Sequence, residues 1–233
     1  MATLKAPKTI SRRQELRKDA VTTVWVRIQE VFYGNRGIAW AVASGIVTIV
    51  AGILGWNFFQ DARGVQADEA LGGIIRTYEN GDYQLALDGT ATAVGLLEII
   101  DDYGSTPAGN IARFYAADAS YRLGDYETAL EFFEDYNGGN DLLGASALAG
   151  QGAIYELSAD FERAADLYVR AAETVDNSLV SPIYWMSAGL AYQKAGIFED
   201  AETAFRTIKD TYPDSEEAKD IDFYLGRVLV RLN

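Results

Sequence analysis

The 233-residue chain contains no cysteine and no histidine. Zinc sites built from these residues, iron–sulfur clusters, disulfides and catalytic dyads that use a thiol or an imidazole are therefore excluded. A lipid anchor attached through cysteine is excluded for the same reason. We expect no cofactor, no metal site and no catalytic residues, and we predict that the protein is not an enzyme.

Positive charge is scarce and unevenly placed along the chain. Residues 1–36 hold eight Lys or Arg and three Asp or Glu, whereas residues 37–233 hold 12 against 31, a net charge of −19. This acidic part is a poor match for nucleic acid or anionic lipid head groups, which need clustered Lys and Arg. Its acidity keeps the domain soluble, reflects a salty habitat or favours basic partners. Adjacent carboxylates such as Asp101 and Asp102 point in different directions on a helix, so we assign them to solvent.

One long stretch carries no charge: the 24 residues from Gly37 to Gln60, between Arg36 and Asp61. At about 1.5 Å of rise per residue, a helix of this length crosses a hydrocarbon layer of about 30 Å. Trp40 and Trp56 lie near its two ends, as interfacial anchors do. A cleaved secretory signal has a shorter apolar region and a small-residue cleavage site. We therefore predict one uncleaved transmembrane helix over 37–60.

The charge asymmetry predicts the orientation of this helix. Cytoplasmic flanks collect Lys and Arg, so residues 1–36 are expected in the cytoplasm and residues 61–233 outside it. Residues 1–11 are basic and are expected to be disordered. Residues 12–36 show an amphipathic helical pattern, which lies on an anionic inner leaflet or packs on the cytoplasmic face of another membrane protein.

Small residues within the predicted span are spaced four apart. Such pairs let another transmembrane helix approach closely, although Gly is common in such helices without a partner. The candidate packing residues are Ala41, Gly45, Ala51 and Gly55.

Residues 61–233 contain a repeated motif. Its copies begin at Gly81, Gly124, Ala159 and Gly196, and each carries an aromatic residue two positions later and an alanine three positions after that. The last three copies are separated by 35 and 37 residues, whereas 43 residues separate the first from the second, which indicates an insertion near Asp88–Ala93. Apolar residues recur at spacings of three and four, so we expect helices and no strands.

Helix boundaries are marked by local signals. Thr106-Pro107 and Ser181-Pro182 are each predicted to be an N-cap followed by proline at the first helical position. Asp214 and Glu217 have the spacing of a capping box. The stretch 215–232 is predicted to be one amphipathic helix that covers the end of a helical stack.

The repeat resembles the tetratricopeptide repeat (TPR), a pair of antiparallel helices with small residues where they cross and aromatic residues between them. The copy that matches best carries the family's residues at Trp185, Gly189, Tyr192, Gly196, Phe198, Ala201, Phe205 and Pro213. The resemblance implies an all-α protein in which an amphipathic helix and a single transmembrane helix precede a TPR solenoid over 61–233. Small residues at the contacts allow close packing, so we assign the motif residues to the core.

TPR stacks generally bind extended peptides or helices on the concave face, which the first helix of each unit lines. By helical phase, the exposed positions of this face are Phe114, Asp118, Tyr121, Arg122, Glu156, Met186, Gln193 and Lys194. The aromatic and methionine residues would favour apolar peptide segments. Arg122 and Lys194 could pair with a peptide carboxylate, or they are ordinary solvated helix ends.

The overall plan resembles the bacterial inner-membrane TPR proteins that are ancillary subunits of the Sec translocon. The resemblance is clearest in two short segments, Gly34-Asn35-Arg36-Gly37 before the span and Gly55-Trp56 at its end. The resemblance implies a periplasmic TPR domain that contacts Sec subunits, exported polypeptides or periplasmic chaperones. The alternatives are a scaffold for envelope or outer-membrane assembly and, more remotely, an envelope-polymer hydrolase that uses two carboxylates. Association of two stacks into a homo-oligomer is left open.

Overall fold

The computed structural model describes residues 36–232, apart from the side chains of residues 36, 38, 39, 43 and 57–61. The predictions for residues 1–11, and for all but the last residue of the helix 12–36, lie outside the described residues. The chain divides into two compact units, residues 1–59 and 60–233.

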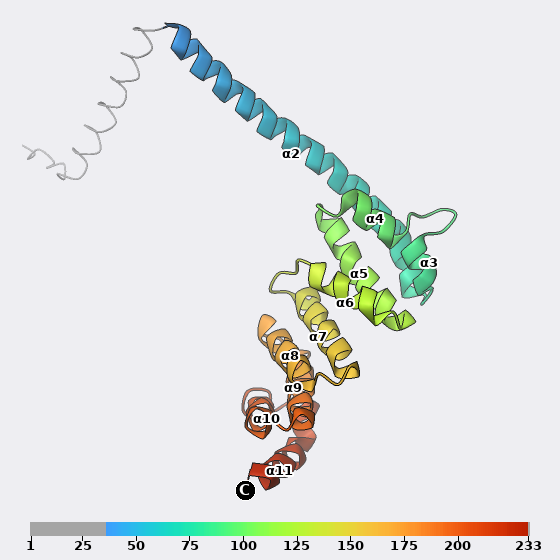
Figure 1. Ribbon diagram of the computed structural model, residues 1–233, viewed down its shortest axis with the longest axis vertical. Coiled ribbons are helices and arrows are strands. Elements are labelled where there is room, and N and C mark those ends of the chain that lie inside the picture. Colours follow the sequence, from blue (N-terminus) through green and yellow to red (C-terminus); the bar gives the residue numbers. More distant parts are fainter. Residues whose placement is uncertain (1–35, 233) are drawn as a thin grey trace, which may run out of the picture. The chain divides into compact units, whose positions relative to one another are not determined.

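Helix α2 (Arg36–Glu79) contributes to both units (Figure 1). Within residues 1–59, every described side chain from 44 to 56 is exposed, including Trp56 at 63% and Ile49 at 64%. Among the described residues, no helix has both the length and the apolar character needed to cross a membrane. Part of the predicted span 37–60 falls on side chains outside the described set.

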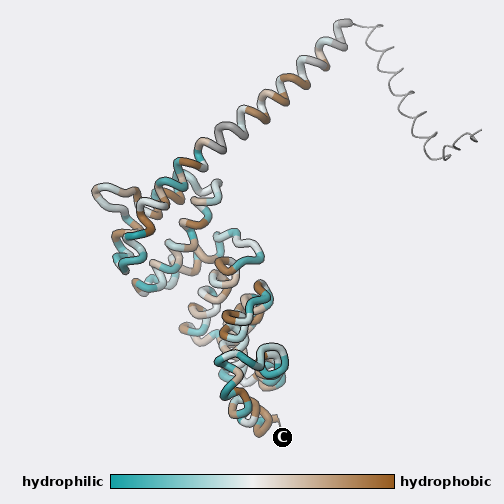
Figure 2. The backbone as a smooth tube through the Cα atoms, turned by 180° about the vertical axis from the view of Figure 1, so that it is seen from behind, coloured by the Kyte–Doolittle hydropathy of each residue, from teal (hydrophilic) through white to brown (hydrophobic). Residues whose placement is uncertain are grey.

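The unit of residues 60–233 is built from helices along its described length, as predicted. In chain order after α2, the elements are α3 (Tyr83–Asp88), α4 (Leu96–Tyr103), α5 (Pro107–Leu123), α6 (Tyr126–Asp135), α7 (Leu142–Leu157), α8 (Phe161–Thr174), α9 (Ser181–Ala195), α10 (Phe198–Thr211), the short 3₁₀ helix η1 (Glu217–Asp220) and α11 (Ile221–Leu232). Consecutive helices from α5 to α11 pack on one another, which makes a stack of helix pairs. Figure 2 shows hydrophobic and hydrophilic residues alternating along these helices.

The buried residues of this unit form three clusters, and each cluster is made by helices that are consecutive in the sequence. One cluster joins the end of α2 to α3, α4 and α5, a second joins α5, α6 and α7, and a third joins α8 to α11. Alanine dominates all three clusters, and the fully buried Phe205 and Ile208 are among the largest side chains of the third. Each helix pair therefore shares its buried surface mainly with its neighbours along the chain, as in a solenoid.

Glycines let aromatic rings pack directly on helix backbones. A Cβ atom added at Gly189 of α9 would lie 2.4 Å from the Phe205 ring of α10. In α7, a Cβ at Gly150 would lie 2.5 Å from the Phe133 ring of α6. Both distances are shorter than a carbon–carbon contact, so these positions have room only for glycine.

The predicted caps are partly correct. Thr106 accepts a hydrogen bond from the backbone N–H of Gly109 at 3.1 Å, which confirms it as the N-cap of α5. The prediction for Ser181 is wrong, because α9 already begins at this residue and the Ser181 hydroxyl bonds the preceding loop. It donates to the carbonyl of Val175 at 2.6 Å and accepts from the N–H of Asn177 at 3.2 Å.

The last predicted helix begins with a tighter turn. The Ser215 hydroxyl accepts a hydrogen bond from the N–H of Ala218 at 3.2 Å, and the N-cap residue of η1 is Glu216 rather than the predicted Asp214. The predicted single helix 215–232 is observed as η1 followed by α11. Likewise, the predicted insertion falls where the chain leaves α3 at Asp88 and re-enters a helix only at Leu96.

Candidate protein-binding site

The eight predicted groove residues lie on the first helices of three consecutive pairs. Phe114, Asp118, Tyr121 and Arg122 lie on α5, Glu156 lies on α7, and Met186, Gln193 and Lys194 lie on α9. No observation on the chain tests whether they bind a partner, so their role stays a prediction. Their contacts nevertheless separate them into an apolar and a polar group.

The apolar members of this set are half-buried and take part in packing. The Phe114 ring lies 6.0 Å from that of Phe133 and 5.7 Å from that of Tyr136. The Tyr121 ring lies 5.5 Å from that of Tyr126, and Met186 packs against the third core cluster. Each of these side chains therefore has part of its surface in contacts within the stack, and part of it stays accessible.

The polar members on α5 form a network with the preceding helices. Asp118 accepts hydrogen bonds from the Tyr78 hydroxyl and from the Arg122 guanidinium, and Arg122 lies over the Tyr83 ring at 5.4 Å. Burial, followed by the hydrogen bond to Asp118, raises the pKa of Tyr78 above its ordinary value. The hydrogen bond to Asp118 likewise raises the pKa of Arg122.

An equivalent network joins α7, α8 and α9. Glu156 accepts hydrogen bonds from Lys194 at 2.6 Å and from the Tyr168 hydroxyl at 3.1 Å. The Lys194 ammonium also lies 5.5 Å from the centroid of the Phe161 ring. Burial and the nearby Glu156 charge raise the pKa of Tyr168.

The two networks share one position in the repeat. Arg122 and Lys194 each lie two residues before the left-handed glycine that ends their helix, and each covers the aromatic residue that starts the second helix of the preceding pair. The sequence analysis assigned these aromatic residues to the core and missed their contact with the cations. The constant offset from the glycine is the signal that could have revealed it.

Among the eight predicted groove residues, the five charged or amide side chains form a row that stays partly accessible. We call this row the first-helix face; its members are Asp118, Arg122, Glu156, Gln193 and Lys194. The side chains of Arg122 and Lys194 are 49% and 52% exposed, and those of Asp118 and Glu156 are 22% and 31% exposed. Charges of both signs are therefore presented to solvent above a packed core.

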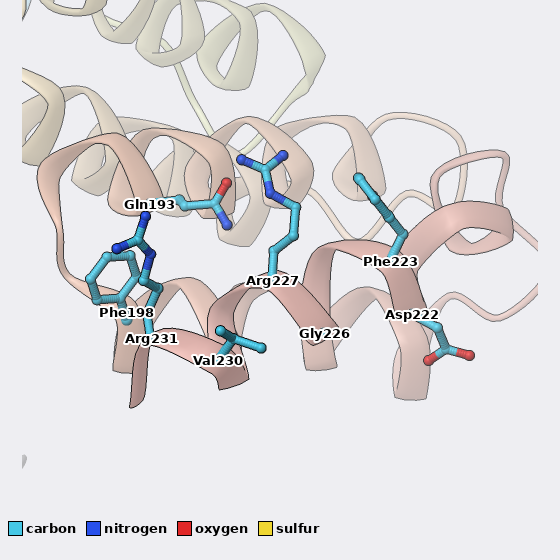
Figure 3. Close-up of a pocket in the computed structure, with 8 residues that line it drawn as sticks. All are labelled: Gln193, Phe198, Asp222, Phe223, Gly226, Arg227, Val230 and Arg231. Atoms are coloured by element: carbon cyan, nitrogen blue, oxygen red, sulfur yellow. The ribbon is translucent and has the colours of Figure 1, made fainter. Parts of the chain in front are cut away.

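The first-helix face continues at Gln193 into a groove beside α11, shown in Figure 3. This α11 groove has a volume of about 630 Å³ and lies between α11 and the corner joining α9 to α10. Its lining residues are Gln193, Phe198, Asp222, Phe223, Gly226, Arg227, Val230 and Arg231. In the view of Figure 3, Phe223 and Arg227 point toward the side of Gln193, while Asp222 points away from it.

The α11 groove combines exposed apolar groups with positive charge. Phe223 is 63% and Val230 is 77% exposed, and the Arg227 guanidinium lies 5.7 Å from the centroid of the Phe223 ring. Asp222 pairs with Lys209 at 2.7 Å. The sequence analysis treated α11 only as the end of the stack and did not single out its arginines.

The described residues contain no cluster of carboxylates that could hold a metal ion. Each buried side-chain nitrogen or oxygen among them has a hydrogen-bond partner. Asp101 and Asp102 are both exposed.

The candidate membrane-packing residues lie on α2. Ala41, Gly45, Ala51 and Gly55 are all exposed, and a Cβ atom added at either glycine would meet no atom within 4 Å. Their proposed contact with another helix stays a prediction.

Comparison with known proteins bears on the repeat. The family profile described as "Tetratricopeptide repeat" matches residues 78–141 and 155–216, more than half of the chain. No curated protein sequence matches the chain significantly.

Solved structures show the same fold. Two crystal structures of nearly identical TPR-like repeats, from a Podosopora anserina chain assigned to the kinesin light chains, each superpose with a TM-score of 0.52. They are 13% and 14% identical to this chain, cover 72% of it, and are themselves covered over 86% and 87% of their length. The profile match and the stacked helix pairs together show that the chain belongs to the tetratricopeptide repeat family.

Proposed function

We propose that this protein is a membrane-anchored scaffold that binds polypeptide partners through the first helices of its repeats. Proteins of the tetratricopeptide repeat family are in general scaffolds for protein–protein interaction. The observation that carries the proposal is the first-helix face, which places accessible charged and amide groups on three consecutive first helices. A polypeptide lying along this face meets all three helices at once.

The chemistry of the first-helix face favours exchange of its hydrogen bonds with a partner. Lys194 pairs with Glu156, and Arg122 pairs with Asp118, at sites that stay partly exposed. Exposed ion pairs contribute only about 0–1 kcal/mol to stability. A carboxylate of a partner can therefore replace Asp118 or Glu156 in its ion pair at little cost in folding free energy. The Tyr83 and Phe161 rings keep the Arg122 and Lys194 cations in place during this exchange.

The membrane anchor is the second part of the proposal. Apolar side chains around α2, among them Ile46, Val50 and Leu54, are more than 45% exposed. A helix that is apolar on all sides is unfavourable in water and is stable when lipid or protein surrounds it. The basic residues before the span support a cytoplasmic N-terminus and a periplasmic repeat domain.

The pathway rests on resemblance alone. The sequence plan resembles the inner-membrane ancillary subunits of the Sec translocon, so we propose Sec subunits, exported chains or periplasmic chaperones as partners. A scaffold for envelope or outer-membrane assembly is the second candidate, because the turn at Tyr212-Pro213-Asp214-Ser215 resembles repeats in such proteins. An envelope-polymer hydrolase is the remote third, since it would require a working pair of carboxylates.

Site-specific photo-cross-linking tests the binding face. A photoreactive amino acid is placed singly at Arg122, Gln193 or Lys194 in the tagged full-length chain, and the cross-linked proteins are identified by mass spectrometry. Matched control positions are Glu199 and Thr203 on the second helix α10, both of which are exposed. We expect shared adducts at the three test positions and few at the controls. Equal labelling at all five positions would refute the proposed face, and the identities of the adducts decide between the pathways.

Fractionation tests the anchor. The double substitution Val47→Arg with Val50→Arg should shift the protein out of the membrane fraction, because each arginine at a span centre costs about 2.5–3.5 kcal/mol. Val65→Arg with Gln66→Arg adds the same charge at exposed positions outside the span and should leave the fraction unchanged. An unaltered distribution of the first variant would contradict the anchor.

A further inference from the structure

The α11 groove stands out because its charge is opposite to that of the surrounding unit. Residues 37–233 carry 31 acidic side chains against 12 basic ones, and Arg227 and Arg231 nevertheless lie one turn apart on α11. Neither arginine forms an ion pair with any described residue. Like charges at this spacing destabilise a helix by a few tenths of a kcal/mol, although their place near its C-terminus offsets part of the cost.

Apolar surface lies next to this positive charge. Phe223 and Val230 are more than 60% exposed, and the Phe198 ring lines the opposite wall of the groove. Helix α11 thus presents two large exposed apolar side chains beside the groove. Exposed apolar surface that is bordered by charged groups marks a site that a partner covers.

Gly226 leaves the centre of the groove open. It lies in the interior of α11, where glycine costs roughly 1 kcal/mol relative to alanine, and a Cβ atom added there would meet nothing within 4 Å. Packing within the chain therefore gives no reason for glycine at this position. A partner backbone that approaches the helix closely does give one.

We propose that the α11 groove binds a short acidic segment of a partner protein, in which carboxylate side chains flank a bulky apolar residue. The carboxylates pair with Arg227 and Arg231, whose guanidinium groups can each bind a carboxylate through two hydrogen bonds. The apolar residue packs between Phe198, Phe223 and Val230. This inference rests on the proposed function and names the chemistry of one partner segment.

The charge around the groove argues for a compact segment. Two cations, Arg227 and Arg231, are among the described residues that line the groove, and Asp222 at its edge is already paired with Lys209. A long polyanion such as a nucleic acid would be repelled by the acidic unit beyond the groove. Free phosphate would leave the apolar wall exposed to water, whereas a peptide covers both kinds of group.

A peptide-binding measurement on the full-length chain in mild detergent tests the proposal. The probe is a fluorescent peptide of Glu, Leu and Phe with both ends blocked, so that only side-chain carboxylates are charged; its control carries Lys in place of Glu. We expect saturable binding of the acidic probe, weakening with salt, and none of the control. Arg227→Ala with Arg231→Ala should weaken binding about tenfold or more, because the carboxylates of the probe lose their charge-assisted hydrogen bonds.

Matched variants separate recognition from general electrostatics. Arg163→Ala with Arg206→Ala removes two exposed arginines from other helices and should leave the affinity nearly unchanged. Gly226→Ala should stabilise the folded chain and still weaken binding, a combination that a purely structural role would not produce. No saturable binding, equal binding of the Lys probe, or equal effects of the two arginine pairs would overturn the inference.

Other occupants give distinguishable results. Tighter binding of an otherwise identical probe with a free C-terminal carboxylate, abolished by blocking it, would replace the internal segment with a chain end and overturn the proposal. Self-association that is lost with Arg227→Ala and excludes the probe would assign the groove to a second copy instead. Photo-cross-linking at Arg122 and Lys194 is independent of these outcomes, so failure of the groove and failure of the proposed function can be told apart.

Discussion

Glycine and an aromatic ring meet at successive contacts along the stack. Gly150 faces the Phe133 ring of the preceding pair, and Gly189 faces the Phe205 ring of its own pair. A helix of a two-layer stack therefore needs a small residue wherever a ring from a neighbour must reach its backbone. At the residue scale, this pairing of smallest and largest side chains determines how closely the helices approach.

Substituting alanine at such a contact should destabilise the fold. Gly189→Ala forces the fully buried Phe205 ring to move, and overpacking of this kind costs about 1–3 kcal/mol. Gly72→Ala on α2 is the matched control, because its Cβ would meet nothing within 4 Å and alanine is favoured in helices by up to about 1 kcal/mol. Urea unfolding followed by circular dichroism should therefore give changes of opposite sign. A stabilised Gly189→Ala chain would contradict this packing.

Buried tyrosines should make the fold sensitive to alkali. Burial is the first cause that raises the pKa of Tyr78, Tyr168 and Tyr192, followed by their carboxylate partners. In the unfolded chain tyrosine loses its proton near pH 10, at about its ordinary pKa, while the folded chain retains it. The folded state then holds more protons, so the free energy of unfolding falls as the pH rises above about 10 and is unaffected by these groups below it.

Unfolding by urea at about pH 9 and about pH 11 measures this effect. The triple variant with phenylalanine at the three positions should lose less stability between these pH values than the wild-type chain. Because lysines titrate in the same range in both proteins, only the difference between them reports on the tyrosines. Parallel losses in the two proteins would contradict the assignment.

Helix ends in this protein are stabilised by several different devices. Asp125, Asp141 and Asp160 cap α6, α7 and α8 by accepting a backbone N–H bond, at 2.8 Å in the case of Asp141. Ser181 instead ties the loop between α8 and α9 to the start of α9. At the element scale, the direction of each pair is therefore set by short polar contacts in addition to the core.

Removing the Ser181 hydroxyl should cost more than removal of an ordinary helix serine. Ser181→Ala leaves the carbonyl of Val175 and the N–H of Asn177 without their buried partner, which costs about 1–3 kcal/mol. Ser187→Ala removes only an exposed bond to the carbonyl of Ile183 and should be nearly neutral. Thermal unfolding of both variants compares the two costs. Equal effects would show that the loop does not depend on Ser181.

The 60–233 unit as a whole is dominated by negative charge. Its described ion pairs involve exposed partners, such as Lys219 with Glu216, and pairs of this kind contribute little to stability. The excess of acidic groups is therefore largely uncompensated and repels itself. At the scale of the molecule, stability should depend on the ionic strength of the solution.

Added sodium chloride should stabilise the fold. Raising the salt from about 0.02 M to about 0.5 M shortens the screening length from roughly 20 Å to roughly 4 Å and weakens the repulsion. We expect the melting temperature of the full-length chain to rise by several degrees, which corresponds to about 1 kcal/mol. Potassium chloride should act equally, since the effect is screening. A melting temperature that falls with either salt would show that the exposed ion pairs outweigh the repulsion.

The sequence was informative where structure depends on local spacing. The offsets of Gly124, Tyr126 and Ala129 within one copy determine which residues share a helix face, so the repeat, the helices and the place of the insertion could be predicted. Thr106 could be recognised as a cap because its bond to Gly109 spans only three residues. The accessible site residues were harder to predict. Helical phase shows which positions of a helix point away from the core of its own pair, but it does not show which of them the neighbouring helix pair covers.

Side-chain contacts between neighbouring helix pairs could be identified only in the tertiary structure. Phe114 was expected to face a peptide, yet Phe133 and Tyr136 lie against it. Lys194 lies 38 residues from the Glu156 that it bonds, and only the angle at which consecutive pairs stack brings them together. The composition and the repeat spacing alone determine a cysteine-free chain with an acidic, helical repeat domain, because these depend on residue identity and local periodicity. The first-helix face and the α11 groove depend on how the pairs rotate against one another, which is decided by the packing of side chains distant in the sequence.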